Sequence, residues 1–331
     1  MTVLITGGAG YIGSHVAKML HRQGRHTLVI DDLSEGYRQG VKWSDFEQVD
    51  LRDLGALRQV FRRHRIEAVM HFAAKCLVGE SMHEPHKYYD NNVLASFNLL
   101  TCMLEAKVFR LIFSSTCAAY GEPESVPISE VQQPKPISVY GRTKYQFEVM
   151  LQDHALVHPL QYVCFRYFNA AGADRDGDSG EKHDPETHLV PLVIEAALDK
   201  DRPLVVFGND FPTPDGTGVR DYLHVEDIAA AHLLGLAHLE AKGGNEVFNL
   251  GCGKGYSVLE IIAKVEEHLG MEVPYEMTGR RAGDPPELIA DFGKAKRILG
   301  WEPRVSDLDT VIATATTWRR SKEYSRFVRT R

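Results

Sequence analysis

The chain has 331 residues, of which 44% are hydrophobic and 25% are charged, with a formal net charge of -7 and a sequence pI near 6.1. This composition is typical of a globular protein large enough for one large core, or for two cores that share an interface. The acidic balance disfavours non-specific binding to nucleic acid or to an anionic membrane, and no apolar run approaches the roughly 20 residues of a membrane span.

Strand-like runs occur at 2–6, 27–31, 46–49, 68–72, 109–114 and 161–167, with amphipathic helical stretches in most of the intervals. This alternation predicts a parallel, doubly wound sheet. The first run has no basic and apolar leader before it, so we predict a cytoplasmic protein. Ligands of such sheets bind outside the carboxyl ends of the strands, which makes the residues just after each run candidates for a site.

The first of these positions carries a glycine-rich turn. Val3-Leu4-Ile5-Thr6 leads into Gly7-Gly8-Ala9-Gly10-Tyr11-Ile12-Gly13 and then into a helical run. Glycines at this spacing allow a tight turn, close approach to a pyrophosphate and close packing of helix on sheet. The second run ends in Asp31, about 20 residues further on, where an acid binds ribose hydroxyls and repels a 2′-phosphate. The sequence therefore favours NAD over NADP.

The second half of the chain changes character near residue 172. A long charged loop at 174–188 is either a substrate lid or a mobile surface segment, and a second loop spans 211–218. The run 246–251 is expected to return to the sheet, a helix is expected from Ser257 to His268, and 310–331 is expected to be helical and then basic. We predict an α/β fold: a Rossmann-type doubly wound parallel sheet with a smaller, mixed α/β C-terminal substrate domain.

The expected boundaries are 1–170 for the NAD-binding domain, with 222–250 returning to it, and 171–221 together with 251–331 for the substrate domain. The five cysteines are scattered and contain no C-x-x-C, which suggests neither a disulfide framework nor a zinc site. None of the 15 histidines is spaced as a metal pair on a helix face with a carboxylate partner, so no metal site is predicted.

The predicted chemical centre is Tyr140-Gly141-Arg142-Thr143-Lys144, near the start of a helical pattern. Tyr140 and Lys144 share one helix face, and a lysine ammonium together with a positive nicotinamide ring would favour the phenolate, so that Tyr140 acts as a base. A Tyr-x-x-x-Lys pair is common by chance. Ser115-Thr116, at the expected end of the fifth strand, supplies a hydroxyl that could orient the same substrate oxygen.

With these residues in place, the chain resembles the extended short-chain dehydrogenase/reductase superfamily, and within it the UDP-glucose 4-epimerases. The resemblance covers nearly the whole chain. It is carried by the ordered blocks 7–14, 50–53, 78–81, 88–93, 113–121, 140–144, 166–172, 188–191, 207–210, 216–222 and 279–284.

The resemblance implies a catalytic trio of Thr116, Tyr140 and Lys144. The residues that would line NAD are Gly7, Gly10, Tyr11, Ile12, Gly13, Asp31, Asp50, Leu51, Phe72, Ala73, Lys75, Asn91, Lys144 and Tyr167. Those that would bind the UDP-sugar are Thr116, Tyr140, Asn169, His188, Leu189, Phe207, Arg220, Arg281, Asp284 and Leu288. The family commonly has its lysine one residue after Lys75, which leaves the Lys75 contact open. The two arginines suit a diphosphate.

The implied reaction interconverts UDP-glucose and UDP-galactose. Tyr140 removes the 4-hydroxyl proton while C4 gives a hydride to a tightly held NAD, and the 4-keto sugar then turns over before the hydride returns to its opposite face. Alternatives are epimerases of UDP-xylose and UDP-arabinose or of UDP-glucuronate, sugar-nucleotide dehydratases, and a non-catalytic NAD-sensing protein. Dehydratases resemble one another in an Asp-Glu pair after the active-site Thr, where this chain has Cys117-Ala118.

Two further expectations follow from the resemblance. Tyr at the position of Leu288 is associated with plain hexoses, so the smaller Leu288 leads us to the hypothesis that UDP-N-acetylglucosamine and UDP-N-acetylgalactosamine are also substrates. A homodimer is expected through helices near 86–106 and 138–157. Their apolar positions could equally be ordinary core; they are Val93, Leu99, Leu100, Met103, Phe147, Met150 and Leu151.

Overall fold

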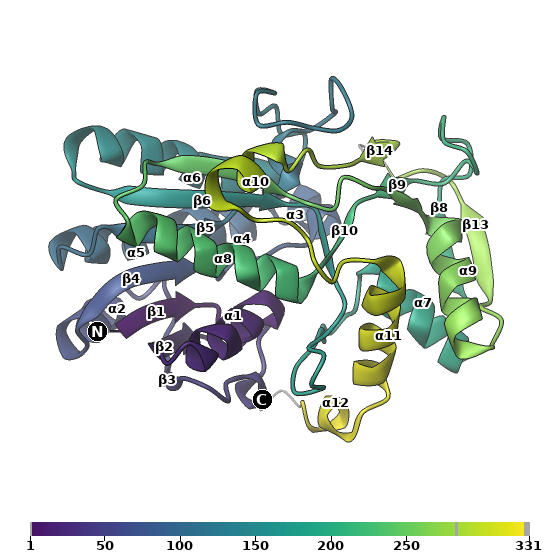
Figure 1. Cartoon of the computed structure of the whole chain (residues 1–331), viewed down its shortest axis with the longest axis horizontal. Coiled ribbons are helices and arrows are strands. Elements are labelled where there is room, and N and C mark those ends of the chain that lie inside the picture. The colour runs from purple at the N-terminus through teal and green to yellow at the C-terminus, as the bar shows by residue number, and fades with distance from the viewer. Residues whose placement is uncertain (1, 282–283, 328–331) are drawn as a thin grey trace.

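The central feature of the computed structural model, which describes residues 2–281 and 284–327, is a seven-stranded parallel sheet (Figure 1). Its strand order is β11-β6-β5-β4-β1-β2-β3. The bounds are β1 (Thr2–Thr6), β2 (His26–Asp31), β3 (Asp45–Gln48), β4 (Ile66–His71), β5 (Arg110–Ser114), β6 (Gln161–Tyr167) and β11 (Glu246–Leu250). The doubly wound Rossmann-type sheet is therefore confirmed, and the run at 246–251 does return to it.

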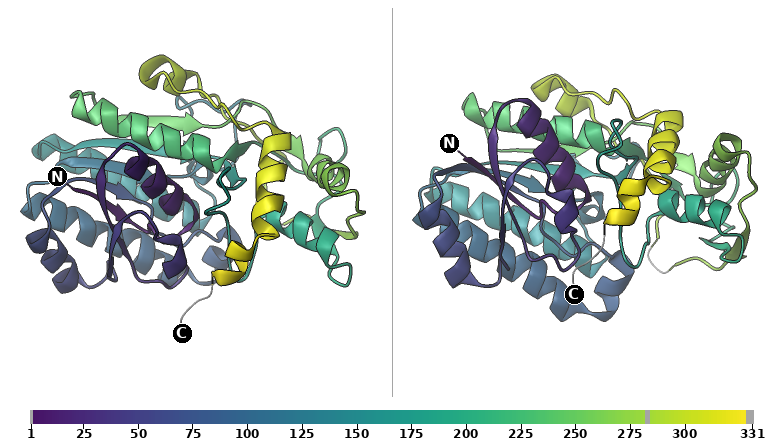
Figure 2. Two further views of the ribbon diagram at one scale, coloured as in Figure 1. Left: turned by 60° about the horizontal axis from the view of Figure 1, so that its bottom comes forward. Right: turned by 90° about the horizontal axis from the view of Figure 1, so that it is seen from below.

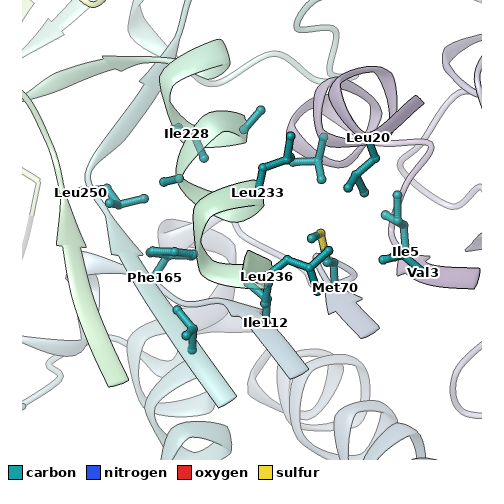
Figure 3. Packing of buried hydrophobic residues seen from close by; sticks show 14 of the residues in the cluster. Val3, Ile5, Leu20, Met70, Ile112, Phe165, Ile228, Leu233, Leu236 and Leu250 are labelled. Atoms are coloured by element: carbon teal, nitrogen blue, oxygen red, sulfur yellow. The ribbon is translucent and has the colours of Figure 1, made fainter. Parts of the chain in front are cut away.

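Alternate residues of each strand point to opposite faces of this sheet, as the strand period of two requires. Val3 and Ile5 of β1 belong to one buried cluster, and Leu4 between them belongs to the other. The first face is covered by α1 (Tyr11–Arg22), α8 (Val225–Glu240) and α10 (Gly293–Leu299), and Figure 3 shows α8 side chains packed on it. The opposite face is covered by α2 (Leu54–Arg63), α5 (Ala95–Glu105) and α6 (Val139–Val157).

A third buried cluster holds together the elements at the other end of the molecule (Figure 2). They are α7 (Leu189–Leu198), β8 (Leu204–Phe207), α9 (Val258–Leu269) and α11 (Leu308–Arg319), and the exposed strand β13 (Tyr275–Thr278) pairs with β8. The helix expected from Ser257 is α9, because the Ser257 hydroxyl accepts from the Glu260 N–H while the Glu260 carboxylate accepts from the Ser257 N–H. Ala295 and Trp301, from the stretch assigned to the second domain, pack in the sheet core. The domain division stays a prediction.

Short elements connect these layers. They are η1 (Arg38–Gly40), α3 (Val78–His83), α4 (Pro85–Tyr88), the π-helical η2 (Tyr89–Leu94), η3 (Cys117–Ala119), β7 (Asn169–Ala171), β9 (Val219–Arg220), β10 (Tyr222–His224), β12 (Tyr256–Ser257), β14 (Glu287–Leu288) and α12 (Lys322–Arg326). Across the described residues, none of the helices has the length and apolar character needed to cross a membrane.

The apolar positions named for a dimer interface divide into two groups. Leu99, Leu100, Met103, Phe147 and Leu151 are fully buried beneath the sheet. They are therefore core residues. Val93 and Met150 are half-buried.

The charged loop at 174–188 is anchored at several points rather than lying free on the surface. The Lys18 ammonium on α1 donates to Asp174, Asp176 and Asp178 at 2.6, 2.8 and 2.7 Å. Trp318 Nε1 donates to the carbonyl of Glu181, and Lys182 Nζ donates to the carbonyl of Phe327, at 2.8 and 2.6 Å. Figure 1 shows this teal segment between α1 and α11. The loop is thus part of the packed structure.

Candidate active site

The predicted site residues gather at the carboxyl edge of the parallel sheet. Thr6 pairs in register with Ile30 of β2 and with His71 of β4, so Gly7, Asp31 and Phe72 follow neighbouring strands at one level. On the other side of β4, Ser114 of β5 pairs with Phe165 of β6, which places Thr116 and Tyr167 near the same edge. This convergence is what a doubly wound sheet uses to bind a dinucleotide.

The glycine turn fits a pyrophosphate. A Cβ on Gly7, whose φ is +72°, would lie 2.5 Å from the Ala73 nitrogen, and a Cβ on Gly13 would lie 2.5 Å from the Gly7 carbonyl oxygen. A Cβ on Gly10 would have the Gly7 oxygen, at 3.3 Å, as its one neighbour within 4 Å among the described residues. Within those residues no side chain caps the N-terminus of α1. Its uncapped N–H groups and the open space at Gly10 suit the predicted contact with a pyrophosphate.

The other residues of the turn fix its position. The Tyr11 hydroxyl donates to the carbonyl of Gly172 at 2.6 Å, joining the turn to the segment after β7. Ile12 is half-buried and packs against the sheet core. Ala73 packs against the opposite core cluster, and Phe72 donates its N–H to Thr6 at 2.9 Å. The turn is therefore held by backbone and apolar contacts.

Asp31 lies at the end of β2 with its carboxylate already oriented. One oxygen accepts from the Ala9 N–H at 3.0 Å and the other from the Leu33 N–H at 2.8 Å. Burial raises the pKa of Asp31 to about 6, although these two hydrogen bonds oppose the rise. Each oxygen retains acceptor capacity, which matches the predicted contact with ribose hydroxyls.

Asp50, Leu51, Lys75 and Asn91 lie along the same side. The Arg52 guanidinium holds the pKa of Asp50 below its usual value, and Leu51 is 7% exposed. Lys75 Nζ donates to Glu35 at 2.7 Å and to Ser34 at 3.1 Å, in the loop after β2. Its side chain thus reaches across toward the Asp31 loop.

Asn91 donates to the carbonyl of Lys87 at 2.8 Å, inside the π-helical turn. Its neighbour Asn92 accepts from the Lys75 N–H at 2.8 Å and donates to the Lys75 carbonyl and to Thr143 at 3.0 and 3.1 Å. Asn92 therefore ties the Lys75 segment to α6. The sequence analysis missed this role, although Asn92 lies in one of the blocks that carried the resemblance.

Tyr140 stands in the first turn of α6. The helix begins at Val139 because the Ser138 hydroxyl caps it by accepting from the Gly141 N–H at 3.0 Å. Gly141 lets this end approach the Thr116 segment, since a Cβ there would lie 2.4 Å from the Ala118 carbonyl oxygen. The Tyr140 N–H donates to Ser81 at 3.1 Å, a contact that the sequence analysis also missed.

Thr116 is the hydroxyl that meets Tyr140. Burial raises the pKa of Tyr140 well above its usual value, with Cys76 and Tyr167 adding to the rise and a hydrogen bond with Thr116 opposing it. Ser115 faces elsewhere: its hydroxyl donates to Glu148, which also accepts from Arg166 Nε at 2.9 Å. Of the two adjacent hydroxyls, the fold assigns Thr116 to the site and Ser115 to a buried ion pair.

Lys144 is 3% exposed, and its ammonium lies 4.5 Å from the centre of the Phe113 ring. Burial lowers the pKa of Lys144 to about 8. The residues of the chain alone therefore leave the phenol of Tyr140 protonated near neutral pH, because burial is the largest influence on its pKa. Tyr167 lies near Tyr140, and the Tyr167 hydroxyl is hydrogen-bonded to Ser114.

The predicted nucleotide-sugar residues come from other elements. Arg220 of β9 is paired with Asp284, and its Nη1 donates to the carbonyl of Val219 at 2.8 Å. The Arg281 guanidinium lies 3.8 Å from the centre of the Phe207 ring. These groups offer two cations and one aromatic face.

The remaining members line the approach from β7 and α7. Asn169 begins β7, where its N–H donates to the carbonyl of Asp221 at 3.0 Å. His188 caps α7 and is bonded through Nδ1 to Glu181, and Leu189 packs in the third core cluster. Leu288 of β14 packs against the cluster containing Cys117, Tyr120, Ile128, Phe168 and Ala290. Cys117 follows Thr116 directly, so this cluster brings Leu288 near the predicted catalytic residues.

Comparisons with known proteins agree with this geometry. Residues 3–251 match the model of the NAD dependent epimerase/dehydratase family. The chain is 46% identical to a UDP-glucose 4-epimerase of Halalkalibacterium halodurans, over 96% of this chain and 95% of that protein. A solved UDP-glucose 4-epimerase from Brucella ovis in complex with NAD has a TM-score of 0.93 and 48% identity, with 95% and 97% of the two chains covered.

A second solved structure adds a nucleotide. The UDP-glucose 4-epimerase from Bifidobacterium longum in complex with NAD+ and UDP has a TM-score of 0.92 and 36% identity, with 96% of this chain and 98% of that chain covered. The family model matches most of the chain, and the chain covers nearly the whole length of these relatives. The chain belongs to the NAD dependent epimerase/dehydratase family.

Proposed function

We propose that the protein is an NAD-dependent UDP-glucose 4-epimerase that interconverts UDP-glucose and UDP-galactose through a 4-keto intermediate. The observation that carries this proposal is the close approach of the first turn of α6, which holds Tyr140 and Lys144, to the Thr116 segment after β5, where a Cβ on Gly141 would lie 2.4 Å from the Ala118 carbonyl oxygen. Relatives named UDP-glucose 4-epimerase, at 46% and 48% identity, support it.

In this proposal the three side chains act on the sugar 4-hydroxyl. Thr116 orients the hydroxyl by hydrogen bonding, and Tyr140 takes its proton and later returns it. NAD, when bound, supplies the acceptor and then the donor of the C4 hydride, and its positive nicotinamide ring lowers the pKa of the Tyr140 phenol. Lys144 stays cationic near neutral pH, since its pKa is about 8, and stabilises the phenolate.

The epimerase mechanism also requires the keto sugar to turn over while the nucleotide stays bound. Arg220 and Arg281 provide charged contacts for a diphosphate, and Phe207 provides an aromatic face for the nucleotide. The sugar end is bordered by the apolar Leu288 and Phe168, which make few directional bonds. Strong anchoring at one end and weak contacts at the other fit this requirement.

The test is to incubate the purified protein separately with UDP-glucose, UDP-N-acetylglucosamine, UDP-xylose and UDP-glucuronate, without added NAD, and to identify the products. Conversion of UDP-glucose to UDP-galactose is expected. Conversion of another sugar alone would move the specificity to a different nucleotide-sugar epimerase. No product from any sugar, in protein that contains bound NAD, would favour the NAD-sensing alternative.

A dehydratase is disfavoured by the structure around Thr116. The next two residues are the buried Cys117 and the half-buried Ala118, in η3, where dehydratases would place an acid and a base. Neither side chain is suited to carry a proton to a departing hydroxyl. Ala118 has no ionisable group, and burial raises the pKa of the Cys117 thiol to about 12.

We also propose a cytoplasmic homodimer. Met82, Leu94 and Phe97, on α3, η2 and α5, are 52%, 47% and 45% exposed, and the Phe97 ring lies 6.5 Å from that of His154 on α6. An apolar surface across these helices suits a second copy of the chain. Sedimentation analysis is expected to show a dimer for the native protein and a monomer for Phe97→Lys, and a monomeric native protein would contradict the proposal.

A further inference from the structure

Four side chains of the anchored loop converge on one point beside the proposed nucleotide-sugar site. One ligand atom from each of Glu181, His183, Glu186 and His188 lies within 4.8 Å of every other. We propose that these four side chains bind a divalent transition-metal ion, for which zinc is the best chemical match. The sequence analysis predicted no metal site, because the two histidines lie on a loop and not at helical spacing.

The donor set determines the class of metal. Two imidazoles and two carboxylates can surround zinc as four ligands in tetrahedral geometry, whereas calcium and magnesium prefer oxygen ligands throughout. His183 Nδ1 lies 3.3 Å from a Glu181 oxygen and 3.5 Å from a Glu186 oxygen. The two imidazole rings are perpendicular, with their centres 5.1 Å apart.

One buried atom indicates that the cluster is incomplete as a hydrogen-bond network. His183 Nδ1 is buried and has no hydrogen-bond partner of normal geometry among the described residues, although two carboxylates lie close to it. A buried polar atom without a partner is costly. A shared ion would satisfy it together with both carboxylates.

Hydrogen bonds from neighbouring groups also orient these side chains and their backbone, as is usual for metal ligands. Glu186 accepts from the N–H groups of Thr187 and His188 at 2.8 and 3.0 Å. The Glu181 backbone is fixed by Trp318, whose indole N–H donates to its carbonyl at 2.8 Å.

A neighbouring acidic cluster provides a contrast within the same loop. Asp174, Asp176 and Asp178 also bring three ligand atoms together, but the Lys18 ammonium lies among them and donates to all three. The Lys18 ammonium has no lone pair to offer a metal, whereas His183 and His188, whose pKa values are raised by the neighbouring carboxylates, each offer a ring nitrogen once an ion displaces the proton. The aspartate cluster serves as a matched control for the Glu181 cluster.

Metal binding would affect the enzyme through His188. If His188 contacts the nucleotide sugar, an ion held by its ring competes with that contact, and zinc inhibits competitively with UDP-glucose. This consequence rests on the proposed function, whereas binding itself does not.

The test is to titrate the chelator-treated full-length protein with zinc chloride and to measure zinc binding by calorimetry during the titration. One ion per chain is expected. His183→Gln and Glu186→Gln should each weaken binding by at least about tenfold, since even outer partners of metal ligands are worth about 10–100-fold. Gln at 186 retains an oxygen that accepts the two N–H bonds.

Asp176→Asn and His158→Gln are the control variants, and both should bind zinc like the native chain. His158 is exposed, and its ring lies 6.1 Å from that of His154, so it tests for a surface histidine pair as the binding site. Thermal melting checks that each variant folds. If only one of His183→Gln and Glu186→Gln folds, the zinc affinity of that variant is sufficient for the test. The proposal is overturned if the native chain binds no zinc, if folded His183→Gln and Glu186→Gln bind like the native chain, or if a control variant loses the binding.

Discussion

The proposed cofactor side and the proposed nucleotide-sugar side of the site differ in the interactions that hold their residues in place. On the cofactor side, Gly7 and Gly13 leave no room for a side chain, and Asp31 is bound by two backbone N–H groups. On the sugar side, Arg220 pairs with Asp284 and His188 pairs with Glu181. One side is shaped by backbone, and the other is held by opposed charges.

This difference matches the roles proposed for the two ligands. A backbone cradle requires little rearrangement and suits a group that stays bound through many turnovers. Charge pairs must exchange partners when a diphosphate enters, which suits a substrate that binds and leaves. The proposed catalytic residues lie where the two sides meet, so the variants below test the junction and each side separately.

The largest effect is expected at the junction. Tyr140→Phe removes the proton carrier, and kcat for UDP-glucose should fall by about 10²–10⁴-fold or more. Bound NAD, measured after acid release, should be unchanged. Tyr275→Phe, at a tyrosine 43% exposed on β13, is the control and should keep full activity. A Tyr140→Phe enzyme with near-native kcat would exclude Tyr140 as the base.

On the cofactor side, Gly7→Ala should remove bound NAD from the purified protein. The new Cβ would lie 2.5 Å from the Ala73 nitrogen, in a backbone conformation with φ of +72°. Gly24→Ala is the matched control, because its φ is +71° and no described atom lies within 4 Å of its Cβ position. Gly24→Ala should cost about 1–2 kcal/mol of unfolding free energy and no NAD. Equal NAD loss in both variants would show that backbone conformation, not close packing, controls binding.

On the sugar side, Arg220→Met should raise KM for UDP-glucose by about 10–100-fold, the value of a charge-assisted hydrogen bond, while NAD content stays native. Arg280→Met is the control. Arg280 also pairs with an aspartate, Asp210, and lies 4.4 Å from the centre of an aromatic ring, that of Phe211, but it was not predicted to bind substrate. If both variants raise KM equally, general positive charge rather than Arg220 binds the diphosphate.

At the sugar end, Leu288→Tyr should reduce kcat/KM for UDP-N-acetylglucosamine by about tenfold or more while activity on UDP-glucose is retained, since pocket volume discriminates on this scale. Leu288→Met, which keeps the volume, should change neither substrate. Equal activity of Leu288→Tyr on both sugars would reject the hypothesis that Leu288 leaves room for the N-acetyl group.

The smallest effect is a pH dependence. Lys144 has a pKa of about 8, lowered by burial, so its ammonium is charged below that pH and neutral above it. Because this charge stabilises the Tyr140 phenolate, kcat should fall to about half at pH 8 and continue to fall as the pH rises. Lys144→Arg stays charged and should lack this alkaline decline, even if its kcat is lower. A native kcat that is flat to pH 9.5 would contradict the role of Lys144.

The sequence by itself determined the parallel sheet, the glycine turn, Asp31 and the cap of α9. Each of these depends on local properties: the spacing of apolar residues, the position of glycines, and a serine at the expected start of a helix. Tyr140 and Lys144 share a helix face for the same reason. Short-range rules govern these features, so the order of residues was enough.

Tertiary structure decided the features that depend on residues far apart in the chain. It assigned Thr116 rather than Ser115 to Tyr140, because Ser115 is bound to Glu148, 33 residues away. It also separated buried Leu99 from exposed Phe97 on one helix. The loop at 174–188 is fixed by Lys18 and Trp318, and that anchoring brings His183 and His188 together with Glu181 and Glu186. No local pattern encodes such contacts, because they exist only once separate elements have packed.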